Sequence, residues 1–255
     1  MRGTKMERRG WKRRVARRGG IAAHVVTFTN LGCGFASLLL MYEGQVNLAV
    51  SLIFLAMVLD FFDGALARMA GHGSAFGKEL DSLADLISFG VAPAFLAYQA
   101  QVGPSQLVVG LVALTFVFSG AWRLALFNIA ESGRDFRGMP ITVAGGLMAA
   151  IAHQAYVAGD WPWPVLAFFT VGLAGLMVCR VKFIKLSRVL VPAIRRLPDE
   201  IRWTVVLLII PTVAIIMEPS SLAVVTLGGV YVVFSLLDNR RSSAPAVKIS
   251  EEVAH

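Results

Sequence analysis

The stretch that decides the fold is residues 46–67, VNLAVSLIFLAMVLDFFDGALA. From Val46 to Leu59 it is apolar except at Asn47 and Ser51. A helix needs roughly 20 apolar residues to cross a hydrocarbon core about 30 Å thick. This stretch therefore predicts a membrane-spanning helix that carries acidic residues near its end.

The composition of the whole chain points the same way. Of its 255 residues, 56% are hydrophobic and 16% are charged, and the mean hydropathy is +0.69. Soluble domains average about 45–50% apolar and about 25% charged residues. The composition argues against a soluble enzyme, a disordered chain, a disulfide scaffold and a collagen-like fibre. It predicts an all-α fold, a polytopic transmembrane helix bundle.

Apolar runs of similar length recur along the chain and predict about eight spans. They lie at 24–42, 46–67, 82–101, 106–127, 141–158, 162–179, 203–217 and 220–237. If the N-terminus is cytoplasmic and the spans alternate in direction, all 24 lysines and arginines fall on the cytoplasmic side. This positive-inside pattern predicts a multi-pass protein of the cell membrane with both termini in the cytoplasm. It also explains the net charge of +8 without a nucleic-acid partner.

Two of the predicted spans carry pairs of aspartates at their cytoplasmic ends. Asp60 and Asp63 stand three residues apart in the second span, and Asp81 and Asp85 stand four apart in the third. Each spacing places its pair on one face of a helix, so we expect the four carboxylates to face one cavity. Four acids cannot all stay ionised together without compensating charge. Two Mg²⁺ or Mn²⁺ ions held by carboxylate oxygens are the natural compensation.

Two other interpretations of these aspartates remain open. They could be ion-pair or hydrogen-bond partners that pack the bundle, or the ion-binding carboxylates of a cation transporter. The matched depth of the four carboxylates, with Arg68 as the single arginine nearby, argues against packing alone. The position of the cluster near the inner interface, in a sequence without a visible inverted repeat, argues against a transporter.

Together these residues form the ordered pattern Asp60-x2-Asp63-Gly64-x2-Ala67-Arg68-x8-Gly77-x3-Asp81-x3-Asp85. The pattern resembles the signature of the CDP-alcohol phosphotransferase family, with every typed position in place. The resemblance implies a six-helix catalytic core, a metal site that faces the cytoplasm and often a homodimer. It implies that the metal ligands are Asp60, Asp63, Asp81 and Asp85, with Asp85 also the catalytic base. It further implies that the CDP site is lined by Asp60, Gly64, Ala67, Arg68 and Gly77.

Further blocks resemble the phosphatidylserine synthase branch of that family. They are Thr27-Phe28-Thr29-Asn30, Ser88 to Ala94, Trp122-Arg123-Leu124, Phe127-Asn128 and Phe136-x-Gly138-Met139-Pro140. One departure is Leu126, where the branch commonly has arginine. The resemblance implies transfer of a phosphatidyl group from CDP-diacylglycerol to the hydroxyl of L-serine with release of CMP. Arg123 and Asn128 are then candidate acceptor-binding residues.

The same motif leaves other donors and acceptors open. Archaetidylserine synthesis, and transfer to glycerol phosphate, inositol phosphate or choline, use the same eight residues. The expected organisation is a basic cytoplasmic tail at 1–23, the transferase core at 24–185, a basic connector at 186–202, two additional spans at 203–237 and a cytoplasmic tail at 238–255. Membrane lipids are expected to surround the core, and the last two spans have no functional interpretation.

Overall fold

The computed structural model describes residues 24–70, 75–101, 103, 105–129, 138–179, 181, 229 and 232, with only the course of the backbone for 62–70. Every regular element within these ranges is helical. This confirms the prediction of an all-α bundle. The predicted spans at 203–217 and 220–237 lie outside the described residues, apart from Gly229 and Val232, of which Val232 packs against the core.

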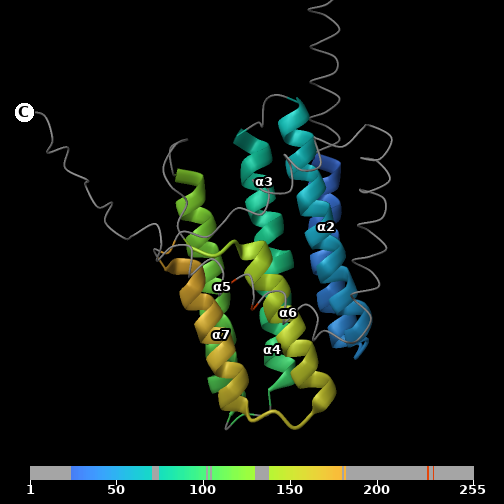
Figure 1. Ribbon diagram of the computed structural model, residues 1–255. Helices are drawn as coiled ribbons and strands as arrows, with labels where there is room; N and C mark the ends of the chain where they lie inside the picture. The colour runs from blue at the N-terminus through green and yellow to red at the C-terminus, as the bar shows by residue number, and fades with distance from the viewer. Residues whose placement is uncertain are drawn as a thin grey trace, which may run out of the picture.

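The helices follow the predicted spans closely. They are His24–Tyr42, α2 Val46–Ala70, α3 Ala75–Asp85, the π-helix η1 Leu86–Val91, α4 Ala92–Ala100, α5 Gln106–Ile129, α6 Ile141–Ala158 and α7 Trp163–Val178. Because α3, η1 and α4 follow one another without a break, Ala75–Ala100 is one continuous helical stretch. Figure 1 shows the helices side by side along their lengths.

Within the described part of the chain, four helices are long and apolar enough to cross a membrane. They are His24–Tyr42, Ala75–Ala100, Gln106–Ile129 and Ile141–Ala158. Val46–Phe61, in α2, and Trp163–Val178 are shorter apolar helices. Large apolar side chains remain exposed on the outside of the bundle, among them Phe168, Leu107, Trp122 and Ile129. A polytopic helical membrane protein has such a surface because lipid covers it.

The third helical stretch begins earlier than hydropathy predicts, at Ala75 instead of residue 82. Its first two turns contain Lys78, Glu79 and Asp81, which lower the local hydropathy. Polar residues do not prevent helix formation, and here they extend the helix beyond its apolar part. Asp81 and Asp85 therefore lie within α3 and at its end, not at the start of a helix.

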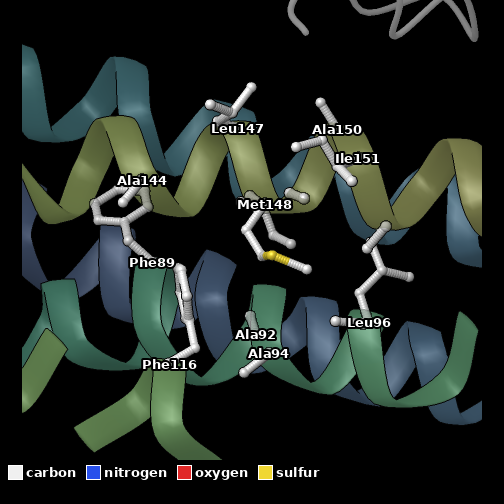
Figure 2. Close-up of a cluster of buried hydrophobic side chains, with 14 of the residues drawn as sticks. Phe89, Ala92, Ala94, Leu96, Phe116, Ala144, Leu147, Met148, Ala150 and Ile151 are labelled. Carbon is white, nitrogen blue, oxygen red and sulfur yellow. The ribbon is translucent and has the colours of Figure 1, made fainter. Parts of the chain in front are cut away.

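The core forms where α6 lies against η1 and α4, and where α5 lies against α7. Figure 2 shows buried side chains where α6 meets η1 and α4, with Phe116 of α5 beside them; they include Phe89, Ala92, Leu96, Ala144, Met148 and Ile151. At Gly145 an added Cβ would lie 2.7 Å from the Phe89 Cα. The backbones of α6 and η1 are thus in direct contact, which requires glycine at this position.

The segment before α6 is fixed to the end of α7. The Gly138 N–H donates to the Val181 carbonyl (2.8 Å), and the Met139 N–H donates to the Leu176 carbonyl (2.9 Å). Gly138 has φ +89°, and an added Cβ would collide with the Met177 carbonyl. Glycine is required here for both reasons. The first turn of α6 is thereby held in place.

Polar contacts also join helices at the other end of the bundle. The Asn47 Oδ1 of α2 lies 2.8 Å from the His153 Nε2 of α6. The Gln99 Nε2 of α4 donates to the Met41 carbonyl of the first helix (3.1 Å). Because Asn47 precedes Asp60 by thirteen residues of α2, these contacts lie about 20 Å along the helix from that aspartate.

Candidate functional site

Three of the four predicted aspartates come together in the structure. Asp60 of α2 and Asp81 and Asp85 of α3 each offer a carboxylate oxygen, and these oxygens all lie within 4.8 Å of one another. Asp85 is buried, with 8% of its surface exposed, and Asp60 and Asp81 are half-buried. Three carboxylates held this close form a donor set that hard divalent cations prefer. The residues present therefore fit the predicted metal site.

Helix geometry explains why the three carboxylates meet. The four-residue spacing of Asp81 and Asp85 puts them on one face of α3, one turn apart. Asp60 lies in the second half of α2, and the chain enters the next helix, α3, at Ala75. Figure 1 shows α2 and α3 side by side. Gly77, also predicted for this site, lies one turn before Asp81 and is half-buried.

The other predicted residues on α2 follow Asp60 on the same helix. The backbone of α2 is helical through Asp63 and on to Ala70. The side chains of Asp63, Gly64, Ala67 and Arg68 lie outside the described residues. Their roles as metal ligand and CDP-binding residues stay predictions.

Two side chains from other helices contact the carboxylates. The Thr142 Oγ1, in the first turn of α6, donates to the Asp60 Oδ2 (3.2 Å). The Asn30 Nδ2, in the first helix, donates to the Asp85 Oδ1 (3.5 Å). Asn30 is fully buried. The first helix, α2, α3 and α6 therefore all contribute side chains at the cluster.

Thr142 was not predicted as a site residue from the sequence. Asn30 was noted there only as part of a block that resembles one branch of a family. Placing a threonine inside a membrane helix costs little free energy, whereas placing an aspartate there costs much. A threonine in a predicted span therefore does not indicate a functional site as an aspartate does. The only sequence feature that could have indicated Thr142 is its position. It lies two residues after Pro140, at the beginning of the predicted span 141–158, which contains no charged residue.

The helix changes its winding directly after Asp85. The π-helix η1 runs Leu86–Val91, and such segments are rare and often occur at functional sites. Within it, the Ser88 Oγ donates to the Asn30 carbonyl (3.0 Å). One turn further along the first helix, a Cβ at Gly34 would lie 2.7 Å from the Ser88 Cα. The first helix is thus packed tightly on η1, next to the carboxylate that Asn30 contacts.

The candidate acceptor residue Asn128 lies where α5 ends against α3. Its Nδ2 donates to the Glu79 Oε2 (2.9 Å) and lies 3.1 Å from the Ser82 Oγ. The Lys78 Nζ donates to the carbonyls of Phe127 (3.2 Å) and Asn128 (3.1 Å). A lysine bound to the last carbonyls of a helix stabilises that end. This group of side chains fixes the polar turns of α3 to α5.

The other acceptor candidate, Arg123, is buried in α5 with 8% of its surface exposed. It stands five residues before Asn128, which corresponds to about 140° around an α-helix. The two candidates therefore face different directions from α5, and each keeps its acceptor role as a prediction.

Comparison with known proteins decides the family. A family model described as CDP-alcohol phosphatidyltransferase matches residues 21–178, more than half of the chain. The chain belongs to this family. The matched range contains the helix His24–Tyr42 and every helix from α2 to α7, and it includes the aspartate pattern on α2 and α3.

Curated proteins of the family are similar to this chain over a little less than two thirds of its length. The CDP-diacylglycerol--serine O-phosphatidyltransferase of Bacillus subtilis is 39% identical over 160 residues, which cover 62% of this chain and 87% of the relative. The archaetidylserine synthase of Methanothermobacter thermautotrophicus is 37% identical over 164 residues, covering 62% of this chain and 67% of the relative. A Helicobacter pylori protein with the same name as the Bacillus one is 33% identical over 174 residues, covering 65% and 73%.

Proposed function

We propose that this chain transfers the phosphatidyl group of CDP-diacylglycerol to the hydroxyl of L-serine, forming phosphatidylserine and releasing CMP. The observation that carries the proposal is the approach of the Asp60, Asp81 and Asp85 oxygens to within 4.8 Å in a member of this family. The names of its relatives support serine as the acceptor and CDP-diacylglycerol as the donor. Family membership supports an enzyme of phospholipid biosynthesis in the membrane.

In the proposed reaction, the serine hydroxyl oxygen forms a bond to the phosphorus that carries diacylglycerol. The bond from that phosphorus to the bridging oxygen of the diphosphate breaks, and CMP leaves with this oxygen. The serine proton passes to the carboxylate of Asp85, which acts as general base. Asp85 is the most buried of the three clustered aspartates, and its contact with Asn30 holds it in place.

We further propose that Asp60, Asp63, Asp81 and Asp85 hold two divalent ions, Mg²⁺ or Mn²⁺. When bound, the ions supply neutralisation of the diphosphate and of the leaving CMP. Gly64, Ala67 and Gly77 leave room for the nucleotide against the helix backbones, and Arg68 offers a planar donor pair for its phosphates. Arg123 and Asn128 are the proposed contacts to the acceptor.

The positive-inside pattern of the sequence supports a multi-pass arrangement with the site and both termini on the cytoplasmic side. This side is also where the water-soluble substrate and CMP are found. The family resemblance supports a homodimer, which a mass measurement of the protein in detergent tests directly.

The experiment is CMP release by the full chain, purified in detergent and supplied with CDP-diacylglycerol and Mn²⁺ or Mg²⁺. L-Serine, glycerol 3-phosphate, inositol phosphate and choline are supplied separately. We expect release with serine alone. Release with another acceptor instead would overturn the substrate while keeping the family chemistry, and no release with any acceptor would overturn the reaction.

Because one relative is an archaetidylserine synthase, the lipid donor needs its own comparison. The same assay with L-serine and a CDP-activated ether lipid measures the preference for the hydrocarbon linkage. We expect faster CMP release with CDP-diacylglycerol. Faster release with the ether lipid would reassign the donor and leave serine as the acceptor.

A further inference from the structure

The carboxylates at the centre of the site are touched by neutral side chains that the family motif does not contain. Thr142 approaches Asp60 from α6, and Asn30 approaches Asp85 from the first helix. Both contacts join residues distant in the sequence. Each is therefore formed only when the helices of the bundle have packed together.

The Asn30 amide is oriented by its surroundings. It is fully buried, and its own backbone carbonyl accepts a hydrogen bond from the Ser88 Oγ (3.0 Å). Only the NH₂ end of an amide can donate to a carboxylate, which places the Nδ2 toward Asp85. The Asn30 Oδ1 is buried without a hydrogen-bond partner among the described residues. A buried acceptor without a partner is costly, so this oxygen indicates that a donor from a ligand or a bound water completes the site.

We propose that Asn30 and Thr142 are positioning residues that hold the Asp85 and Asp60 carboxylates in the orientation that binds the divalent ions. The proposal rests on the metal site proposed above. A carboxylate rotates easily about its Cβ–Cγ bond, and a hydrogen bond to one oxygen fixes the direction of the other. Hydrogen-bond partners of metal ligands commonly act in this way, and losing one typically weakens metal binding about 10–100-fold.

The two residues make the same kind of contact from two different helices. Thr142 holds the aspartate of α2, and Asn30 holds the last aspartate of α3. Neither donor carries a charge, so neither competes with the cations for the carboxylates as an arginine or lysine would.

The test measures metal binding without turnover. The full chain is purified in detergent, stripped of metal with a chelator and titrated with Mn²⁺, and free Mn²⁺ is followed by electron paramagnetic resonance. The variants are Thr142→Val, which keeps the shape and loses the hydroxyl, Thr142→Ser, which keeps the hydroxyl, and Asn30→Leu. Asn30→Ala replaces Asn30→Leu if the leucine variant does not fold.

Two buried hydroxyls that donate to backbone carbonyls and not to a carboxylate provide matched controls. The Thr170 Oγ1 donates to the Leu166 carbonyl (2.8 Å), and the Ser37 Oγ donates to the Gly34 carbonyl (2.7 Å), each within its own helix. Both side chains are fully buried. Thr170→Val and Ser37→Ala therefore remove a buried hydroxyl without touching a carboxylate.

We expect the Mn²⁺ dissociation constant to rise about 10–100-fold in Thr142→Val and in the Asn30 variant. Thr142→Ser and both controls should keep wild-type affinity, and thermal unfolding in the presence of chelator should not separate the variants from the controls. Unchanged Mn²⁺ affinity in Thr142→Val and the Asn30 variant, or an equal loss in the controls, would overturn the positioning role. A wild-type chain that binds no Mn²⁺ would instead overturn the metal site itself.

Discussion

Replacing Gly34 by alanine tests whether the packing of the first helix on η1 maintains the site. An added Cβ would lie 2.7 Å from the Ser88 Cα and 3.0 Å from its Cβ. Carbon atoms prefer a separation of about 3.5–4.0 Å, so the first of these contacts is about 1 Å too short. The Ser88 Cα belongs to the η1 backbone and cannot swing away as a flexible side chain can. The two helices must therefore move apart.

Gly32 provides the matched control on the same helix. A Cβ at Gly32 would meet nothing within 4 Å. Both substitutions gain the same helix propensity, about 1 kcal/mol, and this gain cancels when the two variants are compared. The remaining difference is the cost of overpacking, about 1–3 kcal/mol. We expect the thermal transition of Gly34→Ala to lie below that of Gly32→Ala by roughly 2–4 °C per kcal/mol.

The same displacement should reduce activity. Moving the first helix away from η1 lengthens the hydrogen bond from the Ser88 Oγ to the Asn30 carbonyl and moves the Asn30 amide relative to Asp85. A misplacement of about 1 Å near a reacting centre can cost up to about 10²-fold in rate. The assays are thermal unfolding in detergent and CMP release with CDP-diacylglycerol and L-serine. Equal stability of the two variants would refute the packing argument, and wild-type CMP release by a destabilised Gly34→Ala would refute its connection to the site.

Three further predictions follow from individual contacts and from the metal site. Asp85→Asn should lower CMP release by about 10²–10⁴-fold through loss of the general base without lowering the thermal transition. The control Asp160→Asn, in an exposed loop, should keep wild-type turnover. Near wild-type CMP release by Asp85→Asn would contradict the role of Asp85 as general base. EDTA should abolish CMP release and added Mg²⁺ or Mn²⁺ should restore it, and release that resists the chelator would exclude the metal requirement. Lys78→Met removes the hydrogen bonds to the Phe127 and Asn128 carbonyls and should destabilise the chain by about 1–2 kcal/mol, an effect that an unchanged thermal transition would disprove.

The meeting of Asp60, Asp81 and Asp85 could be predicted from the sequence because it depends on two strong regularities. Membrane-spanning helices need long apolar runs, and these runs predicted where the two helices that carry these residues lie in the sequence. Residues four apart then share a face of a helix, as Asp81 and Asp85 do. Carboxylates are so costly in an apolar helix that their positions stand out.

The contacts made by Thr142 and Asn30 could not be derived from the same regularities. Both side chains are cheap to place in a membrane helix, so nothing in their local sequence marks them. Which carboxylate each contacts depends on how the first helix and α6 pack on η1, through close approaches at Gly34 and Gly145. Similarly, the π-helix after Asp85 has one extra residue in a turn. The helix propensities of its residues do not predict this change of winding. These features belong to tertiary packing.

The polar contacts at the far end of the bundle have a consequence for the carboxylates. The antiparallel helices α2 and α6 are joined twice, by Asp60 with Thr142 and by Asn47 with His153. These two contacts lie about 20 Å apart along α2. A helix joined to its neighbour at one point can still rotate about its axis, and a rotation by one residue position, about 100°, would turn Asp60 away from the cluster. Because both contacts must be satisfied together, the pair of Asn47 and His153 restricts the rotation of α2. It thereby helps to maintain the direction of the Asp60 carboxylate, which it does not touch.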